Sequence, residues 1–417
     1  MAMKLKGGAL YVSVIISILI SIILSLFIVV AYYNTRSVQA QNSETQLRLS
    51  LESGFEIAQS DYYNTTNTGA WEKMPYNNDS VSIKKMAWGC YTLIDVKARN
   101  MHFRLSRTGL FGTVAWKDTA IVLVEQNRQI GLAGKIRING NCFFPKAGVK
   151  PAYIEGHAFS DLNTIRHYLK PAPDHIPALD EHYLETIAQS QSGLNPYTDS
   201  LLSFMPDQWN QSFSCKSAVL QQGTIRLNNQ ILSNNIRLIA SDVITVENSC
   251  QLTNVLLIAR KVIFKKGFKG TVHVISKDSI VTEDECVFDY PSSFAVHSAQ
   301  VPDSARGNVR GIFFGKDCRF KGGLLAANDK KELSRMMIKL NKGFQFVGNV
   351  YSSDYADIQG VLYGSVCCKS LLLQTPSGVY ENHLFNCLVD PKRYSSGLSV
   401  PAWQKQKEQF TVCARWF

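Results

Sequence analysis

Six acidic side chains lie where short apolar segments alternate with polar corners: Asp242, Asp278, Glu283, Asp284, Asp354 and Asp357. An inverting glycosidase uses two carboxyl groups about 6.5–9.5 Å apart, one as general acid and one as general base. Two of these residues could form such a pair if the segments that carry them stack. Polar corners of repetitive β-folds also carry Asp without catalysing anything. We therefore expect a non-enzymatic protein without a cofactor, and keep polysaccharide binding or cleavage as an alternative.

A second cluster combines carboxylates with histidines ahead of an amphipathic stretch: Asp174, His175, Asp180, Glu181, His182 and Glu185. Both residue types are common metal ligands. The spacing matches no established metal motif such as HExxH. We interpret the cluster as the charged surface of a helix and predict no metal site. The sequence also contains no GxSxG, P-loop or dinucleotide fingerprint that would indicate another reaction class.

Six basic residues lie between positions 260 and 277, with Phe264 and Phe268 among them: Arg260, Lys261, Lys265, Lys266, Lys269 and Lys277. Neighbouring strands lie about 4.8 Å apart, so stacked segments would bring these charges into one patch. Such a patch binds polyanion backbones without reading a sequence. The formal net charge of +11 is compatible with a polyanionic partner. A scattered, solvated surface is the alternative, and no motif specific for nucleic acid is present.

The ten cysteines are spread singly, except for the adjacent pair Cys367 and Cys368. There is no CxxC motif, which excludes a zinc ribbon or a thioredoxin-type site of the usual spacing. Cys250, Cys286 and Cys318 could form disulfides outside the cytoplasm. Free cysteines also serve as small buried hydrophobic residues, and we favour this second interpretation.

A weak repeat organises the middle of the chain. Residues 237–250, 256–268 and 273–286 align on Ile239, Ile258 and Ile275, and further copies follow at 308–327 and 346–368. One copy cannot bury its inner face alone, whereas stacked copies build a continuous core. We therefore predict a mainly β fold with a right-handed parallel β-solenoid over residues 216–376. A β-sandwich is the alternative, and residues 329–343 are a short helix candidate.

The regions flanking the repeat differ in character. Residues 61–160 contain short alternating strands and are expected to form the first part of a β-rich head. Residues 161–215 combine several prolines with a helical pattern, which predicts a helical insertion or linker. Residues 377–417 are expected to cap the solenoid.

The beginning of the chain predicts a membrane anchor. No charged residue lies between Lys6 and Arg36, and about 20 apolar helical residues cross a bilayer. We expect residues 8–33 to form a transmembrane helix in contact with lipid. Lys4 and Lys6 place residues 1–7 in the cytoplasm and the head in the periplasm or outside the cell. Residues 34–60 should continue as a juxtamembrane helix that kinks or fades near Gly54.

A short basic leader that ends in glycine and runs directly into a long helix resembles the class III signal of type IV pilins and pseudopilins. The resemblance implies cleavage between Gly7 and Gly8, and a helix that packs in a filament core. The implied partners are subunits of a pilus or secretion filament. Val12 stands at the fifth mature position, where most of the family carries glutamate. Certain minor subunits also lack that glutamate, so the resemblance is to this minor type.

Two further segments resemble another group of proteins. GKIRINGN at 134–141 and ADIQGVLYGSV at 356–366 alternate apolar residues with corner glycines. They are similar to segments of bactofilins and of bacterial membrane-anchored proteins with solenoid heads. This resemblance implies a self-assembling scaffold, which is a further alternative to the minor pilin-like function.

Overall fold

The computed structural model describes residues 7–59, 68–76, 79–114, 118–159, 165, 168–191, 199–298, 309–328, 335–393, 398–401, 403 and 411–417. These residues divide into two compact units. The smaller unit contains the described residues up to Lys84 together with Val96–Arg107. The larger unit contains Lys85–Asp95 and the described residues from Thr108 onward. The expected leader, residues 1–7, lies outside the described residues apart from Gly7.

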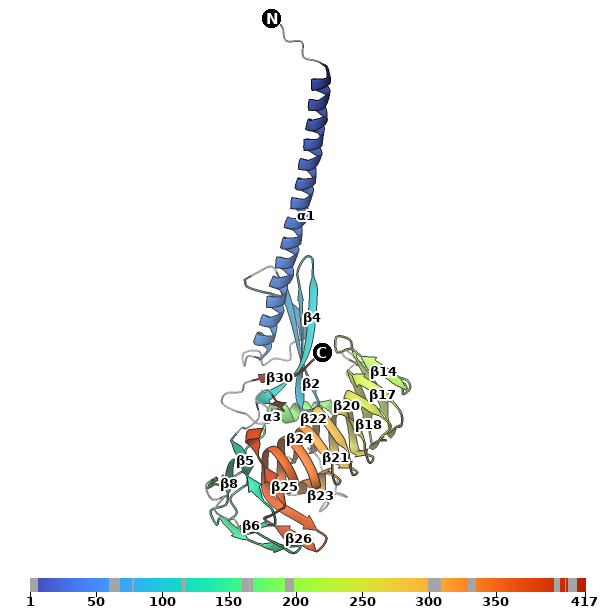
Figure 1. The fold of residues 1–417 in the computed structure, drawn as a ribbon. Helices are drawn as coiled ribbons and strands as arrows, with labels where there is room; N and C mark the ends of the chain where they lie inside the picture. The colour runs from blue at the N-terminus through green and yellow to red at the C-terminus, as the bar shows by residue number, and fades with distance from the viewer. Residues whose placement is uncertain are drawn as a thin grey trace. The chain divides into compact units, whose positions relative to one another are not determined.

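One long helix, α1 (Gly7–Gln59), dominates the smaller unit (Figure 1). Its first half is apolar on every side, which is typical of a helix surrounded by lipid. In its second half Leu47, Leu51, Phe55 and Ala58 are buried at spacings of three or four residues, so they share one face. The expected kink near Gly54 is wrong, because the helix continues unbroken to Gln59.

That face packs against antiparallel strands. Strand β1 (Thr68–Lys73) pairs with β2 (Ser80–Trp88), and the sheet continues through β3 (Tyr91–Arg99) and β4 (Arg104–Val114). A Cβ atom at Gly54 would lie 2.6 Å from Val96 Cγ1 and 2.9 Å from Val81 Cγ1. Helix and sheet therefore approach too closely at Gly54 for a larger side chain, which explains a glycine inside an unbroken helix.

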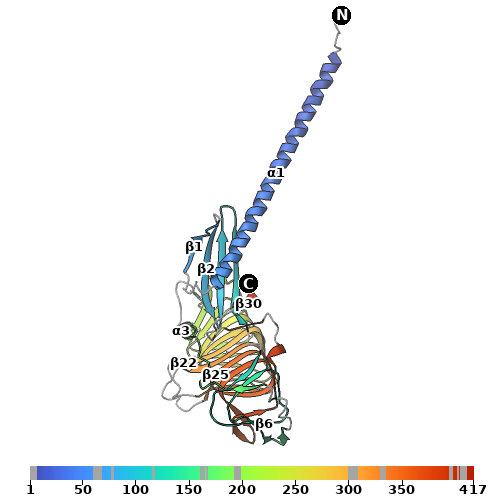
Figure 2. The same ribbon diagram turned by 90° about the vertical axis from the view of Figure 1, so that its left-hand side faces the viewer.

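The larger unit is built around a parallel β-solenoid, and Figures 1 and 2 show its strands stacked in successive layers. The parallel pairing rules out the β-sandwich alternative. The strands of the solenoid are β5 (Thr119–Val122), β7 (Arg137–Ile138), β8 (Asn141–Phe144), β12 (Leu169–Pro171), β13 (Asp199–Leu201), β14 (Gln208–Gln211), β15 (Ser217–Gln222), β16 (Ile225–Leu227), β17 (Ile231–Asn234), β18 (Ile236–Ala240), β19 (Val243–Val246), β20 (Gln251–Phe264), β21 (Lys269–Thr282), β22 (Val287–Ser298), β23 (Val309–Phe313), β24 (Arg319–Asn328), β25 (Arg335–Thr375) and β28 (Cys387–Val389).

Smaller elements complete this unit. Strand β26 (Gly378–Glu381) folds back antiparallel on the end of β25, and β10 (Tyr153–Ile154) forms a hairpin with β11 (His157–Ala158). The remaining elements are the parallel strands β6 (Ile130–Ala133), β9 (Val149–Pro151) and β27 (His383–Phe385), the helix α3 (Glu181–Ser190), a 3-10 turn (Pro391–Arg393), and the strands β29 (Ser399–Val400) and β30 (Thr411–Trp416), which pair with β4.

The register of the repeat is confirmed. Ile239 pairs with Ile258, and Ile258 pairs with Ile275, in parallel strands. The three side chains are buried, but they do not line the solenoid interior. Alternate residues of a strand point to opposite faces, and the interior belongs to the neighbouring positions Leu238, Leu257 and Val274. The isoleucines form a second core on the outer face of the sheet.

This second core is covered by segments far away in the sequence. Trp88, Tyr91 and Leu110 pack on it, as do Ile187 of α3 and Trp403. The Trp88 indole donates a hydrogen bond to the carbonyl oxygen of Asn254 at 3.0 Å. The outer face of the repeat is therefore a packing surface for the rest of the unit, and it is not solvated.

The solenoid interior contains a stack of phenylalanine rings. All are at most 2% exposed, and the centroids of neighbouring rings that are in contact lie 4.6–6.3 Å apart. The rings are those of Phe264, Phe268, Phe288, Phe294, Phe314, Phe320, Phe344 and Phe346. Aromatic pairs at such distances contribute about 0.5–1.5 kcal/mol beyond their burial.

The order of the layers differs from the order of the chain. The last strand of the solenoid repeat, β25, pairs with β5, which pairs with β8, which pairs with β12. Residues 119–171 therefore extend the end of the stack that β25 forms. The chain then crosses to the opposite end, where β13 pairs with β15.

The flanking expectations need two corrections. The helical insertion at 161–215 is present but short, because only α3 is helical and β12, β13 and β14 in the same span belong to the solenoid. The helix expected at 329–343 is wrong for residues 335–343, which begin β25, and residues 329–334 lie outside the described ones. In the expected cap at 377–417, β28 extends the parallel stack and β30 pairs antiparallel with β4.

Candidate functional site

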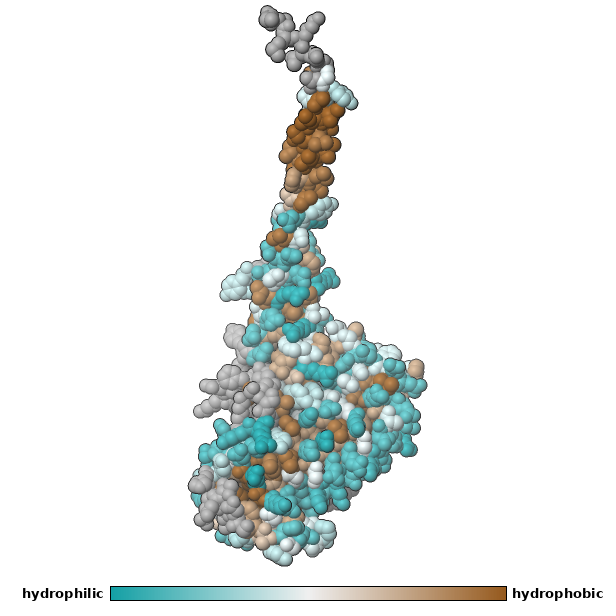
Figure 3. Space-filling model, in the orientation of Figure 1, coloured by the Kyte–Doolittle hydropathy of each residue, from teal (hydrophilic) through white to brown (hydrophobic). Residues whose placement is uncertain are grey.

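The apolar half of α1 is the first candidate site. It is long and apolar enough to cross a membrane, with none of its most apolar window buried. Figure 3 shows this segment as a continuous hydrophobic surface. The chain therefore carries one helix, among the residues that the structure describes, that could serve as a single membrane span.

Four serines occur inside this segment, and their hydroxyl groups could oppose insertion into lipid. Each instead donates to a backbone carbonyl oxygen one turn earlier, at 2.8–2.9 Å. Internal hydrogen bonds of this kind satisfy polar groups that hydrocarbon cannot. The residues are Ser13, Ser17, Ser21 and Ser25, and they do not prevent the helix from spanning a bilayer.

The predicted processing position lies at the start of this helix. Gly7 and Gly8 are its first two residues, and the space where a Cβ of Gly8 would lie contains no atom within 4 Å. Lys4 and Lys6 lie outside the described residues.

The six basic residues of the predicted patch are divided between two corners of the solenoid. The strand segment 261–264 runs between these two corners. The corner at its beginning carries Arg260, Lys261 and, from the next turn, Lys277. The corner after its end carries Lys265, Lys266 and Lys269. Phe264 and Phe268 point into the core and are 0% exposed. Their rings are therefore unable to stack on a bound polyanion.

Ion pairs neutralise half of these charges. Arg260 lies between two carboxylates, with Nη2 2.7 Å from Asp242 Oδ1 and Nη1 3.6 Å from Asp278 Oδ2. Lys265 and Lys266 pair with Glu283 and Glu285, at 2.7 and 3.0 Å. The hydrogen bonds that the two lysines donate to these carboxylates raise the pKa of both lysines. No described acidic side chain forms an ion pair with Lys261, Lys269 or Lys277.

The carboxylates proposed for glycan cleavage are held by the same contacts. Asp278 also accepts a hydrogen bond from Arg310 Nε at 2.8 Å. Asp284 and Asp354 accept backbone N–H groups, of Lys316 at 2.7 Å and Met336 at 2.9 Å. These acceptor contacts link successive turns. Asp278, Asp284 and Asp354 therefore help to hold neighbouring turns of the solenoid together.

Asp357 differs because it is only 1% exposed. Its carboxylate accepts hydrogen bonds from the Gln359 side chain and from the Gln374 backbone N–H, both at 3.1 Å. Burial nevertheless raises the pKa of Asp357 to about 6, because the charged form loses its hydration. A buried carboxyl group of this kind cannot reach a polysaccharide.

The acidic and histidine cluster near α3 contains residue types that commonly bind metals. No group of three or more potential ligands comes together among the described residues. Glu181 begins α3, and both it and Glu185 are exposed. The side chain of His182 lies outside the described ones.

The three cysteines at the corners are free thiols in the core. Cys250, Cys286 and Cys318 are at most 2% exposed. Burial raises the pKa of Cys250. They pack as small apolar side chains, as we favoured from the sequence.

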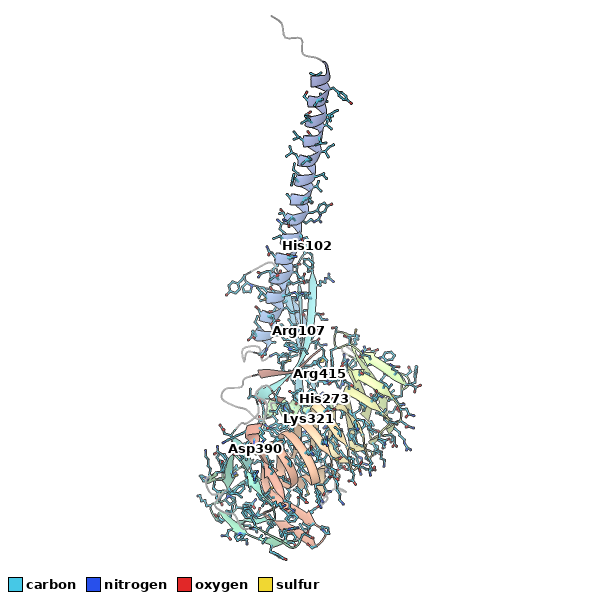
Figure 4. The ribbon with its side chains drawn as sticks, in the orientation of Figure 1. His102, Arg107, His273, Lys321, Asp390 and Arg415 are labelled. Carbon is cyan, nitrogen blue, oxygen red and sulfur yellow. The ribbon has the colours of Figure 1, made fainter. Side chains whose placement is uncertain are left out.

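A buried polar cluster escaped the sequence analysis. His273 of β21, labelled in Figure 4, is 0% exposed. Its Nδ1 lies 2.9 Å from the Ser293 hydroxyl. The same hydroxyl accepts the backbone N–H of Cys90 at 3.2 Å. Burial lowers the pKa of His273 to about 3 and raises that of the Cys90 thiol to about 11. Burial therefore favours the neutral form of both side chains near pH 7.

This cluster instead joins the start of β3 to the solenoid, since the ring of Tyr91 contacts His273 edge-on at 5.8 Å. Only the alternation of polar and apolar residues around position 273 could have indicated it. A lone histidine in a strand gives no sign of which segment will cover it.

Comparison with known proteins adds no assignment. No family model, no curated protein and no solved structure matches this chain. The geometry of the chain itself therefore carries the functional argument.

Proposed function

We propose that this protein is a non-enzymatic, single-pass envelope protein of the minor pilin or pseudopilin type, with a β-solenoid head outside the cytoplasm. The observation that supports the proposal most is the division of α1 into two halves. The first half is exposed and apolar, and the second half packs on an antiparallel sheet through Leu47, Leu51 and Phe55. A rigid helix that joins a membrane span to a folded head is what a filament subunit requires.

The basic leader supports the same proposal, because Lys4 and Lys6 precede the apolar segment and favour a cytoplasmic N-terminus. Added protease should then digest the head of the protein in intact spheroplasts. Protection of the C-terminal part would contradict this orientation.

The decisive experiment is mass spectrometry of the mature N-terminus. We expect a chain that begins at Gly8, and we expect Gly7→Leu to block the cleavage. Gly8→Ala is the matched control, because it keeps Gly7 and its added methyl group would contact no other atom. An N-terminus at Met1 or Ala2 would refute the pilin-like assignment but not the anchor. A start at Gln41 would indicate an ordinary secreted protein.

A self-assembling scaffold is a second candidate, favoured by the first layer of the solenoid. Leu201, Phe204 and Trp209 in or beside β13 and β14 are 61%, 72% and 39% exposed. Among the described strands, β13 and β14 pair only on their inner side, with β15 and β17. Unpaired apolar edges promote association with another sheet. Polymers of the purified protein that disappear in Leu201→Lys would support this candidate.

A further inference from the structure

The hairpin that joins β3 to β4 is strongly basic. Residues 96–107, VKARNMHFRLSR, contain Lys97, Arg99, His102, Arg104 and Arg107 and no acidic residue. Arg107 forms an ion pair with Glu52 of α1 at 3.3 Å, and the Arg99 guanidinium lies 4.1 Å from the centroid of the Trp71 ring. No described acidic side chain forms an ion pair with Arg104. The hairpin therefore keeps net positive charge.

Contacts with α1 fix the direction of this hairpin. Val96, at its base, lies against Gly54. Asn100, at its turn, donates from Nδ2 to the Ser43 hydroxyl at 3.1 Å. Since Ser43 precedes Gly54 by about three helical turns, β3 runs along α1 toward its apolar half. Figure 4 shows His102 at the end of the hairpin beside α1.

The turn is close to the end of the apolar segment. Ser43 lies about ten residues beyond Tyr33, which corresponds to about 15 Å along a helix that rises about 1.5 Å per residue. The turn projects past Asn100 toward the same end. The headgroup layer adds about 5–8 Å to each side of the hydrocarbon core. The tip of the hairpin and its arginine side chains can therefore reach the headgroups.

The tip also combines the side chains that suit an interface. Met101 is 94% exposed, and it stands between Arg99 and Arg104. The Asn100 side chain holds the turn by accepting the backbone N–H groups of His102 and Phe103, at 3.0 and 2.8 Å. An exposed apolar side chain flanked by cations is typical of segments that contact anionic lipid surfaces.

We propose that residues 99–104 form a lipid-contact site that binds anionic headgroups of the same membrane that α1 crosses. This inference rests on the proposed membrane anchor. The contact would limit the tilt of α1 in the bilayer, because the bilayer would hold the smaller unit at two points. Arg104 binds the headgroup phosphate, and Met101 contacts the headgroup layer beside it.

The test uses the full chain in nanodiscs of phosphatidylcholine, with or without phosphatidylglycerol. A photo-crosslinking residue replaces Met101, and the crosslinked lipid is measured by mass spectrometry. Leu19, in the apolar half of α1, is the positive control for the anchor. Glu56, which is exposed on α1 about 20 Å beyond Ser43, is the negative control.

We expect the crosslink yield at position 101 to be at least about threefold higher with phosphatidylglycerol than without it. Arg104→Glu, or about 1 M salt, which shortens the screening length to about 3 Å, should remove that increase. Equal crosslink yields in both lipids, or a yield at position 101 no higher than at position 56, would overturn the inference. Crosslinks at position 19 in the same experiment would still support the membrane anchor. Absence of crosslinks at 19 as well would overturn both.

Discussion

Replacement of Gly348 by alanine should destabilise the solenoid strongly, and the structure gives the size of the effect. Gly348 has φ of +150° and stands in a column with Gly322 and Gly364. A Cβ at Gly348 would lie 1.7 Å from the carbonyl oxygen of Gly322, and one at Gly364 would lie 1.7 Å from that of Gly348. The neighbouring atom is backbone, so relief requires two layers to move apart and lengthen their hydrogen bonds.

Two contributions add up in this variant. A residue with a side chain in a sparsely populated backbone region costs about 1–3 kcal/mol. Forcing extra volume into a packed region costs about 1–3 kcal/mol more. We therefore expect the free energy of unfolding to fall by about 2–6 kcal/mol. This is a large fraction of the total free energy of unfolding of a typical domain, about 5–15 kcal/mol.

Two matched controls separate these contributions. Gly267 has φ of +78°, and a Cβ added there would lie within 4 Å of no other atom. Gly267→Ala should therefore show the cost of the backbone conformation alone, about 1–2 kcal/mol. A Cβ added at Gly223 would also lie within 4 Å of no other atom, and the φ of this residue is not positive. Gly223→Ala should therefore change the free energy of unfolding by no more than about 0.5 kcal/mol. The assay is denaturant unfolding of the detergent-solubilised full chain, followed by tryptophan fluorescence. A Gly348→Ala variant as stable as Gly223→Ala would refute the stacking of these layers.

Three further predictions concern the cores and the buried titratable groups. Ile258→Asp should cost several kcal/mol, because it buries a carboxylate between two apolar layers. Lys265→Gln, at a partly exposed corner, should leave the free energy of unfolding almost unchanged in the same assay. Protonation of His273 is favoured in the unfolded chain, since its folded pKa of about 3 lies below the ordinary histidine value of 6.5. Stability should therefore fall as the pH drops from 6.5 toward 3, by up to about 1.4 kcal/mol per pH unit, and His273→Gln should remove that slope. Asp357 acts in the opposite sense, because its folded pKa of about 6 lies above the ordinary aspartate value of 3.8. The unfolded chain therefore loses this proton first, and stability should fall as the pH rises from about 4 to 6. Asp357→Asn should remove that fall.

The sequence predicted the parallel stacking because its signal is local and repeated. Ile239, Ile258 and Ile275 are spaced by about one turn of the solenoid, and the register places them as direct neighbours. What the pattern could not show is which face of the strand is the interior. Both faces are apolar here, since Leu238 lines the interior and Ile239 lies in the outer core. A strand that is buried on both sides loses the alternation that identifies its inner face.

The position of β5 and β8 at the far end of the stack was also beyond the sequence. Their segments are short and have strand propensity, but propensity says nothing about which edge a strand joins. That choice depends on the crossing segment around α3, whose Ile187 packs on the outer core instead of extending a linker. The intervening prolines suggested a boundary, and the chain uses the region to return from one end of the solenoid to the other.

Charge counting along the sequence failed for a different reason. Arg260 and Lys265 are separated by five positions, yet each pairs with a carboxylate from another turn, Asp242 and Glu283 respectively. In a solenoid the nearest neighbours of a corner residue lie about one turn away in sequence, so a local excess of lysine and arginine does not show the local field. The hairpin at 96–107 shows the converse case, because its two strands are adjacent in sequence and pair with each other. Arg104 has no described acidic partner there, so a run of basic residues in a hairpin is better evidence for a charged surface than a richer run at the corners of a stack.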